Sequence, residues 1–470
     1  MSTRTKEQDV FENKPVLNAI LNLAIPSVLG QVILVIYNMA DTFFVSQTNN
    51  NAMITAVAVC MPAYMFLSAI SNLFGVGGAS VIARSLGEKR EDRAKAASGF
   101  AIWGCLAVTV LYSLGALLFL DTFVDLLGGK NAEVHGYACS YMIVTIIIGG
   151  AFTSMNTLMS HLIRAEGRSF QASFGIALGG ILNVLLDPLF MFVILKPGNE
   201  ALGAALATTI SNAIALLYFV FIIIKNRNVL VLSAKPTPAS FKEQIPKDII
   251  LTGIPACLMT LCENISYAIL DNLMFAAGLA AQTGIGVAKK VNMLAHCVVR
   301  GMAQGVLPLI SYNYASGNRK RMKSVVYMSG AMSVGISLLC TAVALIFSDA
   351  LIGIFLQEAG EARDFGDAFL RILCIGAPFS ACAYTVISFF QATGCGGRSL
   401  VLALMRKGVL DIPMMFVLNG IYRTYGIVWA TPIADMLCCV AAVILFLSFI
   451  KKHGKNVSSD EETIPEYEAV

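Results

Sequence analysis

Long apolar runs recur from one end of the chain to the other, and they constrain the fold more than any other feature of the sequence. A window of about 20 residues, the length that spans a bilayer as a helix, finds twelve of them. The runs cover residues 16–45, 52–83, 96–120, 133–163, 170–195, 201–224, 248–278, 281–313, 324–349, 367–393, 399–418 and 425–450. Strands of a membrane barrel would instead give short alternating segments. The sequence therefore predicts an all-α membrane protein with twelve transmembrane helices.

The composition agrees with a chain that lies mostly in lipid. Of the 470 residues, 57% are apolar and only 13% are charged, against about 25% charged residues in an average soluble domain. This chain lacks the polar surface that a water-facing globule needs, which excludes a soluble enzyme. The twelve cysteines lie almost all inside apolar runs and show no paired CxxC spacing. We therefore expect reduced packing residues, and neither a metal site nor a disulfide framework.

The distribution of lysine and arginine predicts the orientation of the chain. Counted on alternate sides of the twelve runs, 25 of these residues fall on the side of the two termini and only 5 on the other side. Positive charge accumulates on the cytoplasmic side of a membrane protein. We therefore expect a multi-pass protein of the plasma (inner) membrane with both termini in the cytoplasm.

The longest polar connection divides the runs into two sets of six. This predicts an N-terminal six-helix bundle (residues 1–225), a cytoplasmic linker (226–247), a C-terminal six-helix bundle (248–451) and a disordered cytoplasmic tail (452–470). Phrases of the first half recur 223 to 229 residues later, such as LAIPSVLG around Pro26 and TGIPACLM around Pro255. Such a duplication predicts two bundles related by a pseudo-twofold axis, with the substrate path between them.

Polar side chains inside the runs mark candidate transport residues, because a charge in hydrocarbon is costly and is usually functional. At 100° per residue, five polar side chains of the first run fall within an arc of about 120° and form one stripe. They are Ser27, Gln31, Tyr37, Asn38 and Asp41. The alternative is that Asp41 lies at the outer membrane interface with a structural role.

The fifth run carries a second acid beside a helix-breaking residue. Asn183 and Asp187 are four residues apart and share a helix face. Pro188 cannot donate to the carbonyl of Val184, so the helix should bend there. A freed carbonyl beside a carboxylate suits a hard cation or a shared proton. Two neighbouring runs offer further oxygen ligands, from Asn156 and Thr208. The alternative is that Asp187 only forms hydrogen bonds with the ends of helices and has a structural role.

The second half has its own polar stripe, within about 100° on the seventh run. It contains Thr260, Glu263, Asn264, Tyr267 and Asp271. Glu263 is a candidate for a second ion site or for a counter-ion of the substrate, and the role of Asp271 stays open. Lys289, Lys290 and Arg300 of the eighth run are expected to pair structurally with these two acids, although they could also face an aqueous cavity.

Several phrases give the chain a resemblance to a known family. They are GVGGASVIARSLGEKR (residues 75–90), NTLMSHLIRAEGRS (156–169), NVLLDPLF (183–190) followed by GAALAT, GIPACLMTLCE (253–263) and GMAQGVLPLISYNYASGN (301–318). Their order on twelve runs in two halves resembles the multidrug and toxic compound extrusion (MATE) transporters. The resemblance covers almost the whole chain. It implies a carrier that exports its substrate against an inward flow of protons or sodium.

The resemblance also implies where the coupling ion acts. It places a proton- or sodium-responsive site on Tyr37, Asp41, Asn156, Asn183, Asp187 and Thr208. Sodium is a possible occupant at Asp41 and Asp187. The tenth run departs from the pattern, because residues 384–394 lack the aspartate that some members carry there. A complete sodium site in the second half is therefore not expected, and we favour Glu263 as part of the substrate cavity.

These observations predict a cation-coupled antiporter that exports lipophilic, cationic drugs or toxic metabolites by alternating access, with helix 1 bending near Pro26. The expected substrate cavity contains Gln31, Asn38, Glu263 and Tyr267. The alternative is a flippase for a lipid-linked substrate. An enzyme is not expected, because HExxH, GxSxG and phosphate-loop patterns are missing from the sequence. We expect a monomer with small-molecule substrates, no nucleic-acid partner and no cofactor beyond the coupling ion.

Overall fold

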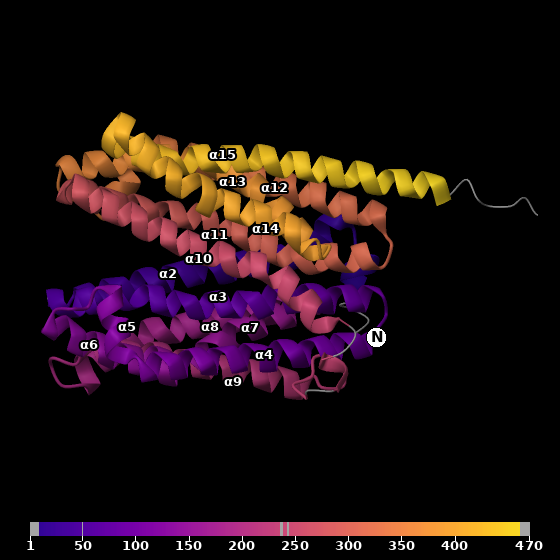
Figure 1. Cartoon of the computed structure of the whole chain (residues 1–470), viewed down its shortest axis with the longest axis horizontal. Coiled ribbons are helices and arrows are strands. Elements are labelled where there is room, and N and C mark those ends of the chain that lie inside the picture. The colour runs from indigo at the N-terminus through magenta and orange to yellow at the C-terminus, as the bar shows by residue number, and fades with distance from the viewer. Residues whose placement is uncertain (1–8, 49, 236–237, 242–243, 461–470) are drawn as a thin grey trace, which may run out of the picture.

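The first half of the chain forms one helical bundle. The computed structural model describes residues 9–48, 50–235, 238–241 and 244–460, and helices account for most of them (Figure 1). The helices of the first bundle are α2 (Val16–Ser46), α3 (Asn51–Gly87), α4 (Glu91–Leu118), α5 (Leu120–Leu127), α6 (Ala132–Met142), α7 (Gly150–Ala165), α8 (Ser169–Pro188) and α9 (Glu200–Lys225). Two π-helical segments, η1 (Ile143–Ile148) and η2 (Leu189–Ile194), extend α6 and α8. The regular α-helix ends at Pro188, as the missing donor predicts.

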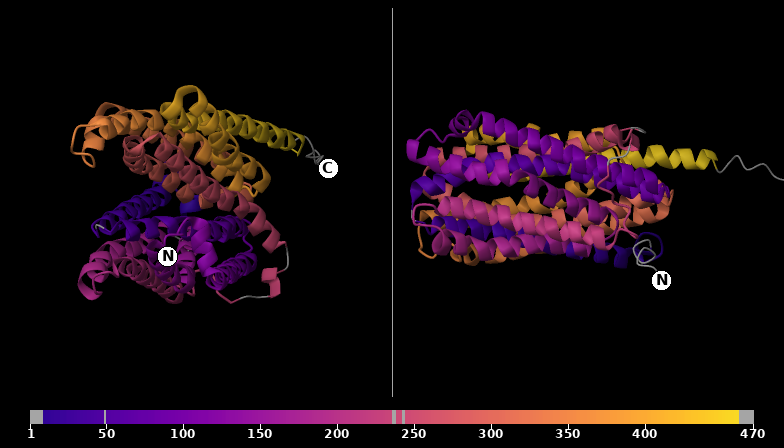
Figure 2. Two further views of the ribbon diagram at one scale, coloured as in Figure 1. Left: turned by 60° about the vertical axis from the view of Figure 1, so that its left-hand side comes forward. Right: turned by 90° about the horizontal axis from the view of Figure 1, so that it is seen from below.

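The second half forms a separate bundle that packs against the first (Figure 2). A short 3₁₀ turn, η3 (Pro238–Phe241), lies in the connection. The helices that follow are α10 (Ile245–Ala277), α11 (Leu279–Ala315), α12 (Arg319–Gly353), α13 (Glu361–Ala392), α14 (Gly396–Leu404) and α15 (Ile412–Asp460), with the π-helix η4 (Met405–Asp411) between the last two. The expected two-bundle architecture is confirmed.

Ten helices of the described chain are long and apolar enough to cross a membrane, and α6–η1 with α7 makes an eleventh span, bent by 48°. The last of the ten runs from Gly396 to Lys452 and holds 57 residues, which is about 85 Å of helix against a hydrocarbon core of about 30 Å. Its backbone leaves the helical region at Arg423 (φ 52°, ψ −134°). This segment is therefore long enough for two crossings.

Contacts across that break show that the segment folds back on itself. The thiol of Cys438 bonds the carbonyl of Leu402 at 3.6 Å, and the hydroxyl of Thr431 donates to Asp411 at 2.9 Å. In each of these contacts one residue precedes Arg423 and the other follows it, and the pair nearer to Arg423 is also the closer pair in sequence. This is the pattern of an antiparallel hairpin. With two crossings here, the structure agrees with the twelve predicted spans.

Two helices extend beyond the predicted boundaries of the linker and the C-terminal tail. Helix α10 begins at Ile245, whereas the linker was expected to continue to residue 247. Helix α15 continues to Asp460, although residues 452–470 were expected to be disordered. Residues 461–470 lie outside the described residues. Both differences arise because polar residues can extend a helix beyond the apolar part that crosses the membrane.

The two bundles touch most closely at one end of the molecule, where α3 ends and α10 begins. We call this the linker end; it is the right-hand end in Figure 1. A Cβ atom on Gly253 would lie 1.8 Å from the carbonyl oxygen of Leu73, and one on Gly77 would lie 2.2 Å from that of Ile249. Only glycine allows these backbones to approach so closely. The linker end is therefore sealed by helix packing.

Candidate transport site

A cavity of about 300 Å³ lies between the two bundles. On α10, the residues that seal the linker end come first, at 249–253, and the cavity-lining residues follow at 260–267. The cavity thus lies on the far side of the seal. The four predicted cavity residues all line it: Gln31, Asn38, Glu263 and Tyr267. Because both repeats contribute to the wall, a relative movement of the bundles would change its shape.

The predicted coupling residues divide into a cavity-facing layer and a layer behind it. Four of them line the cavity: Tyr37, Asn156, Asn183 and Thr208. Asp41 and Asp187 are not among the described residues that line it. Asp187 is fully buried. The side-chain amide of Asn183 donates to Asp187 at 3.1 Å and to the hydroxyl of Thr208 at 3.3 Å. Asn183 thus connects the buried acid to the cavity wall.

Helices α2 and α8 run side by side in a register that brings the two acids to nearly the same depth. A Cβ atom on Gly30 would lie 3.1 Å from Cβ of Ser173, and one on Gly180 would lie 2.9 Å from the ring of Tyr37. In both contacts the residue of α8 follows the residue of α2 by the same number of positions in the sequence, so the two helices run in the same direction. This register places Asp41 within about one turn of Asp187 along the pair. The two acids therefore lie at similar depth on neighbouring helices.

This cluster is rich in oxygen atoms that lack a hydrogen-bond donor. Four buried oxygens have no hydrogen-bond partner among the described residues: Oδ1 of Asp41, Oδ1 of Asn156, Oδ1 of Asn183 and Oδ2 of Asp187. A buried acceptor without a partner costs about 1–3 kcal/mol. A proton on a carboxylate or a hard cation among these oxygens would remove that cost. The arrangement therefore fits either expected coupling ion.

The two acids that the sequence singled out in the second half, Glu263 and Asp271, are both paired with basic side chains. Glu263 Oε1 lies 2.5 Å from Nη2 of Arg300, and both residues line the cavity. Lys289 forms an ion pair with Asp271. Lys289 and Arg300 are thus paired with the two acids as expected, but Arg300 also faces the cavity, which was the alternative. Asp271 is not among the described lining residues of the cavity, and its side chain is 46% exposed. Glu263 therefore faces the cavity as one member of a neutral pair.

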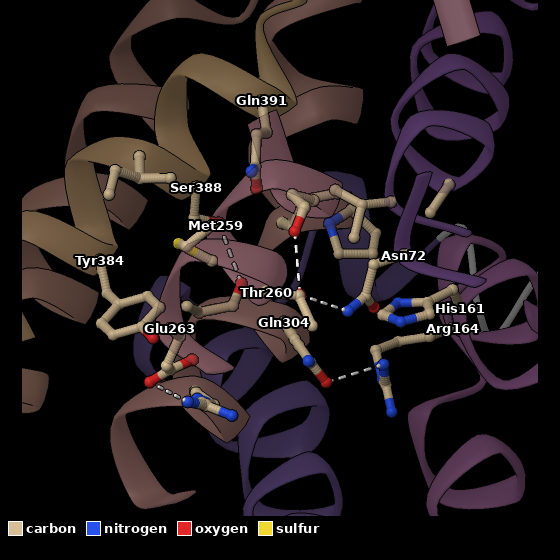
Figure 3. Close-up of a pocket in the computed structure, with 18 residues that line it drawn as sticks. Asn72, His161, Arg164, Met259, Thr260, Glu263, Gln304, Tyr384, Ser388 and Gln391 are labelled. Atoms are coloured by element: carbon tan, nitrogen blue, oxygen red, sulfur yellow. Dashed lines mark hydrogen bonds and ion pairs between the residues drawn. The ribbon is translucent and has the colours of Figure 1, made fainter. Parts of the chain in front are cut away.

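The floor of the cavity is a layer of hydrogen bonds between the bundles. A smaller pocket of about 90 Å³ continues from the cavity toward the linker end; Asn72, His161 and Arg164 lie on one side of it, and Glu263 and Tyr384 lie on the other (Figure 3).

Gln304 of α11 is the centre of this floor. Its Oε1 accepts hydrogen bonds from Gln31 at 3.2 Å and from Arg164 at 3.4 Å. Asn72 donates to Thr260 at 2.9 Å beside it. These contacts join α2, α3 and α7 of the first bundle to α10 and α11 of the second. They must break before the cavity can open at the linker end.

Four buried charges of the second bundle were missed by sequence reasoning. The last two spans contain Arg406, Lys407, Asp411 and Asp435, none more than 2% exposed. Arg406 Nε donates to Asp435 at 2.8 Å, and Lys407 Nζ donates to Asp411 at 2.7 Å. Both cations are among the 25 basic residues counted on the side of the termini, although they lie inside the predicted run 399–418. Removing them from that count does not reverse the predicted orientation. The four-residue spacing of Lys407 and Asp411 inside an apolar run was the available signal.

Two membrane-spanning repeats with a polar cavity between them define a transporter of the two-bundle class. The MatE family model matches the chain twice, at residues 26–189 and 255–417, which together make up more than half of it. The chain therefore belongs to the MatE family. The two matches begin at the repeat-related prolines Pro26 and Pro255. Membership of this family makes the protein a transporter and not an enzyme, as expected.

Known relatives cover nearly the full length of the chain. It is 28% identical over 436 residues to the multidrug export protein MepA of Staphylococcus aureus (strain MRSA252), covering 93% of this chain and 94% of the relative. The MepA of Staphylococcus saprophyticus is 27% identical over 438 residues, with the same coverage. Among solved structures, the outward-facing conformation of a multidrug resistance MATE family transporter of the MOP superfamily superposes with a TM-score of 0.89 at 23% identity. It covers 96% of this chain and 99% of that one.

Proposed function

We propose that this protein exports lipophilic, cationic drugs or toxic metabolites in exchange for an inward flow of protons or sodium. The observation that carries the proposal is the position of the donor-poor oxygen cluster directly behind the wall of a cavity shared by both repeats. The relatives named as multidrug export proteins support drugs as the substrate class. No cofactor beyond the coupling ion is needed, and a single chain supplies both halves of the site.

The proposed mechanism is alternating access. With the linker end in the cytoplasm, as the charge distribution predicts, the sealed floor makes this an outward-facing state. A proton or sodium ion that enters from outside binds among the oxygens around Asp41 and Asp187. Helix α2 carries Asp41, cavity-facing Tyr37 and Asn38, and Gln31 in the floor. Ion binding on this helix therefore changes both the wall of the cavity and the hydrogen bonds of its floor.

Bending of α2 provides a route for that change. Pro26 lies inside the helix and has no N–H to donate, so the helix is weakened one turn before Gln31. Ion and substrate then affect one another's affinity reciprocally, because binding free energies are linked. A flippase would instead need a lateral portal rich in cationic groups. Arg300 in the cavity wall is neutralised by Glu263, so this residue offers no free positive charge to the headgroup of an anionic lipid.

Export itself is tested in cells loaded with ethidium, a lipophilic cation. Cells that produce the protein should retain less dye than cells with an empty vector, and collapse of the ion gradients should remove the difference. Equal dye retention in both cell types, with the protein present in the membrane, would refute cationic drug export.

Glu263→Gln should weaken the binding of cationic drugs more than that of neutral drugs of similar size. The substitution keeps the shape of the side chain but removes its charge, and it leaves the positive charge of Arg300 uncompensated in the cavity wall. Binding of paired cationic and neutral ligands to the purified protein measures the effect.

The double variant Glu263→Gln with Arg300→Gln separates two explanations of that result. If Glu263 only neutralises Arg300, the double variant should recover the affinity for cationic drugs. If Glu263 is the counter-ion of the substrate itself, the affinity should stay low. Equal losses for cationic and neutral ligands in the single variant would contradict a role of this charge in substrate recognition.

A further inference from the structure

A second group of ligand-type side chains lies away from the cavity, between α5 and α6. It consists of Asp121, Asp125, His135 and Cys139, and one ligand atom from each of Asp121, His135 and Cys139 lies within 4.8 Å of the other two. Nε2 of His135 is 3.8 Å from Oδ1 of Asp121 and 3.7 Å from Oδ1 of Asp125. The thiol of Cys139 is 3.8 Å from Oδ1 of Asp121 and 3.5 Å from Nδ1 of His135. The set thus mixes one sulfur, one imidazole and two carboxylates.

The local fold explains why these four side chains meet. Asp121 and Asp125 are four residues apart on α5, and His135 and Cys139 are four residues apart on α6, so each pair shares one helix face. Gly128 ends α5 in the left-handed conformation (φ 108°) and lets the chain turn back. The two faces are therefore presented to each other by a short hairpin.

The hairpin is held in place on both sides of the turn. On α5, the side chain of Val124 is completely buried. Asn131 caps the start of α6, where its side chain accepts a hydrogen bond from the backbone of Glu133 at 3.0 Å. Ligands on packed helices are better positioned than ligands on free loops.

Three of the distances between the proposed ligand atoms approach those of a tetrahedral metal site. Zinc binds sulfur at about 2.3 Å and nitrogen or oxygen at about 2.0–2.2 Å, which puts neighbouring ligand atoms about 3.3–3.6 Å apart. The distances of 3.7 and 3.8 Å from Nε2 to the two carboxylates, and of 3.8 Å from the thiol to Asp121, are within a few tenths of this range. The side chains of Asp121 and Asp125 are 85% and 52% exposed, so they are free to rotate toward an ion held by His135 and Cys139.

We propose that Asp121, Asp125, Cys139 and Nε2 of His135 form a binding site for a divalent transition metal ion, with zinc as the best match to this donor set. On binding, the thiol of Cys139 releases its proton to water and its sulfur bonds the metal. The side chain of Asp121 is 85% exposed, so the ion reaches the site from water. Cys139 is then an exception to the expectation that all the cysteines are packing residues. The ion would fasten α5 to α6, the connection between the third and fourth spans.

The site is tested with cobalt, which reports thiolate coordination by a charge-transfer absorption band. Titration of the purified full-length protein in detergent with Co²⁺ alone should produce the band at one cobalt per chain, and Zn²⁺ should abolish it by displacement. Cys139→Ser should remove the band, and His135→Gln should weaken cobalt binding by at least about tenfold. Cys340→Ser, at a partly exposed cysteine of α12, should leave the band unchanged.

A second measurement shows whether the band is lost in Cys139→Ser only because that variant misfolds. The metal-free Cys139→Ser protein should melt at the wild-type temperature, and Zn²⁺ should raise the melting temperature of the wild type only. A wild-type protein that gives no thiolate band, or a band that survives in Cys139→Ser, would overturn the proposal. If Cys139→Ser fails to fold, an unchanged cobalt affinity in folded His135→Gln would overturn it equally.

Discussion

Replacement of Asp187 by asparagine is expected to abolish ion-driven export while the protein still folds and inserts. The amide keeps the volume of the side chain and much of its hydrogen bonding to Asn183. It cannot bind a proton as a carboxylate does, and it supplies no negative charge to sodium. Substrate affinity should also lose its dependence on pH or sodium, as reciprocal linkage requires. Transport in proteoliposomes and drug binding to the purified protein measure the two effects.

Two matched variants show whether that loss is specific. Asp41→Asn should act in the same direction and less completely, since Asp41 lies near Asp187 on the neighbouring helix. Asp271→Asn removes an acid that is not among the cavity-lining residues and is paired with Lys289, so it should leave the ion dependence intact. An Asp187→Asn protein that pumps at the normal rate and keeps its ion dependence would show that the first-half site is wrong. Glu263 would then be the leading candidate.

Of the variants considered, Asp435→Asn is expected to lose the most stability, with the free energy of unfolding reduced by about 3–5 kcal/mol. The substitution leaves the guanidinium of Arg406 inside the second bundle without its counter-charge, and both side chains are only 1% exposed. The remaining partners of Arg406 are neutral hydroxyl groups, of Tyr384 and Ser380, each at 3.0 Å. Unfolding of the purified protein in detergent, followed by thermal or chemical denaturation, gives the measurement.

An exposed ion pair in the same bundle is the control for this prediction. Arg363 donates two hydrogen bonds of 2.8 Å to Asp349, whose side chain is 63% exposed. Asp349→Asn should therefore unfold close to the wild type, because water screens such pairs. Replacing the buried pair together, by Arg406→Met with Asp435→Leu, should recover much of the lost stability. Equal stability of Asp435→Asn and the wild type would contradict a charge-paired interior.

The sequence was informative about which side chains share a helix face and less informative about how faces meet. Apolar run length predicted the spans because a bilayer imposes one thickness. Helical periodicity grouped Gln31, Tyr37 and Asn38, and all three line the cavity. The contact of Gln31 with Gln304, 273 residues away in the sequence, follows from packing between the bundles. Periodicity along one helix carries no information about it.

The buried charges of the last two spans were missed for a related reason. Arg406 and Lys407 are the eighth and ninth residues of the predicted run 399–418, yet they were assigned to its cytoplasmic end, where positive charges are usual. Their counter-charges are identified only when the chain is known to turn back at Arg423, which brings Asp435 to Arg406. The cluster at Cys139 was overlooked because the cysteines were judged as a group by their apolar surroundings. Its ligands come from two helices on either side of a turn.

Ion-coupled export is tested most directly in proteoliposomes that contain the purified protein and ethidium, with proton and sodium gradients imposed separately. At least one gradient, directed against the drug, should drive ethidium above its equilibrium concentration, and removing that gradient should stop uphill transport. The same gradient should have no effect in Asp187→Asn liposomes. Ethidium movement that equilibrates at the same rate and to the same level with either gradient or with none would contradict the account.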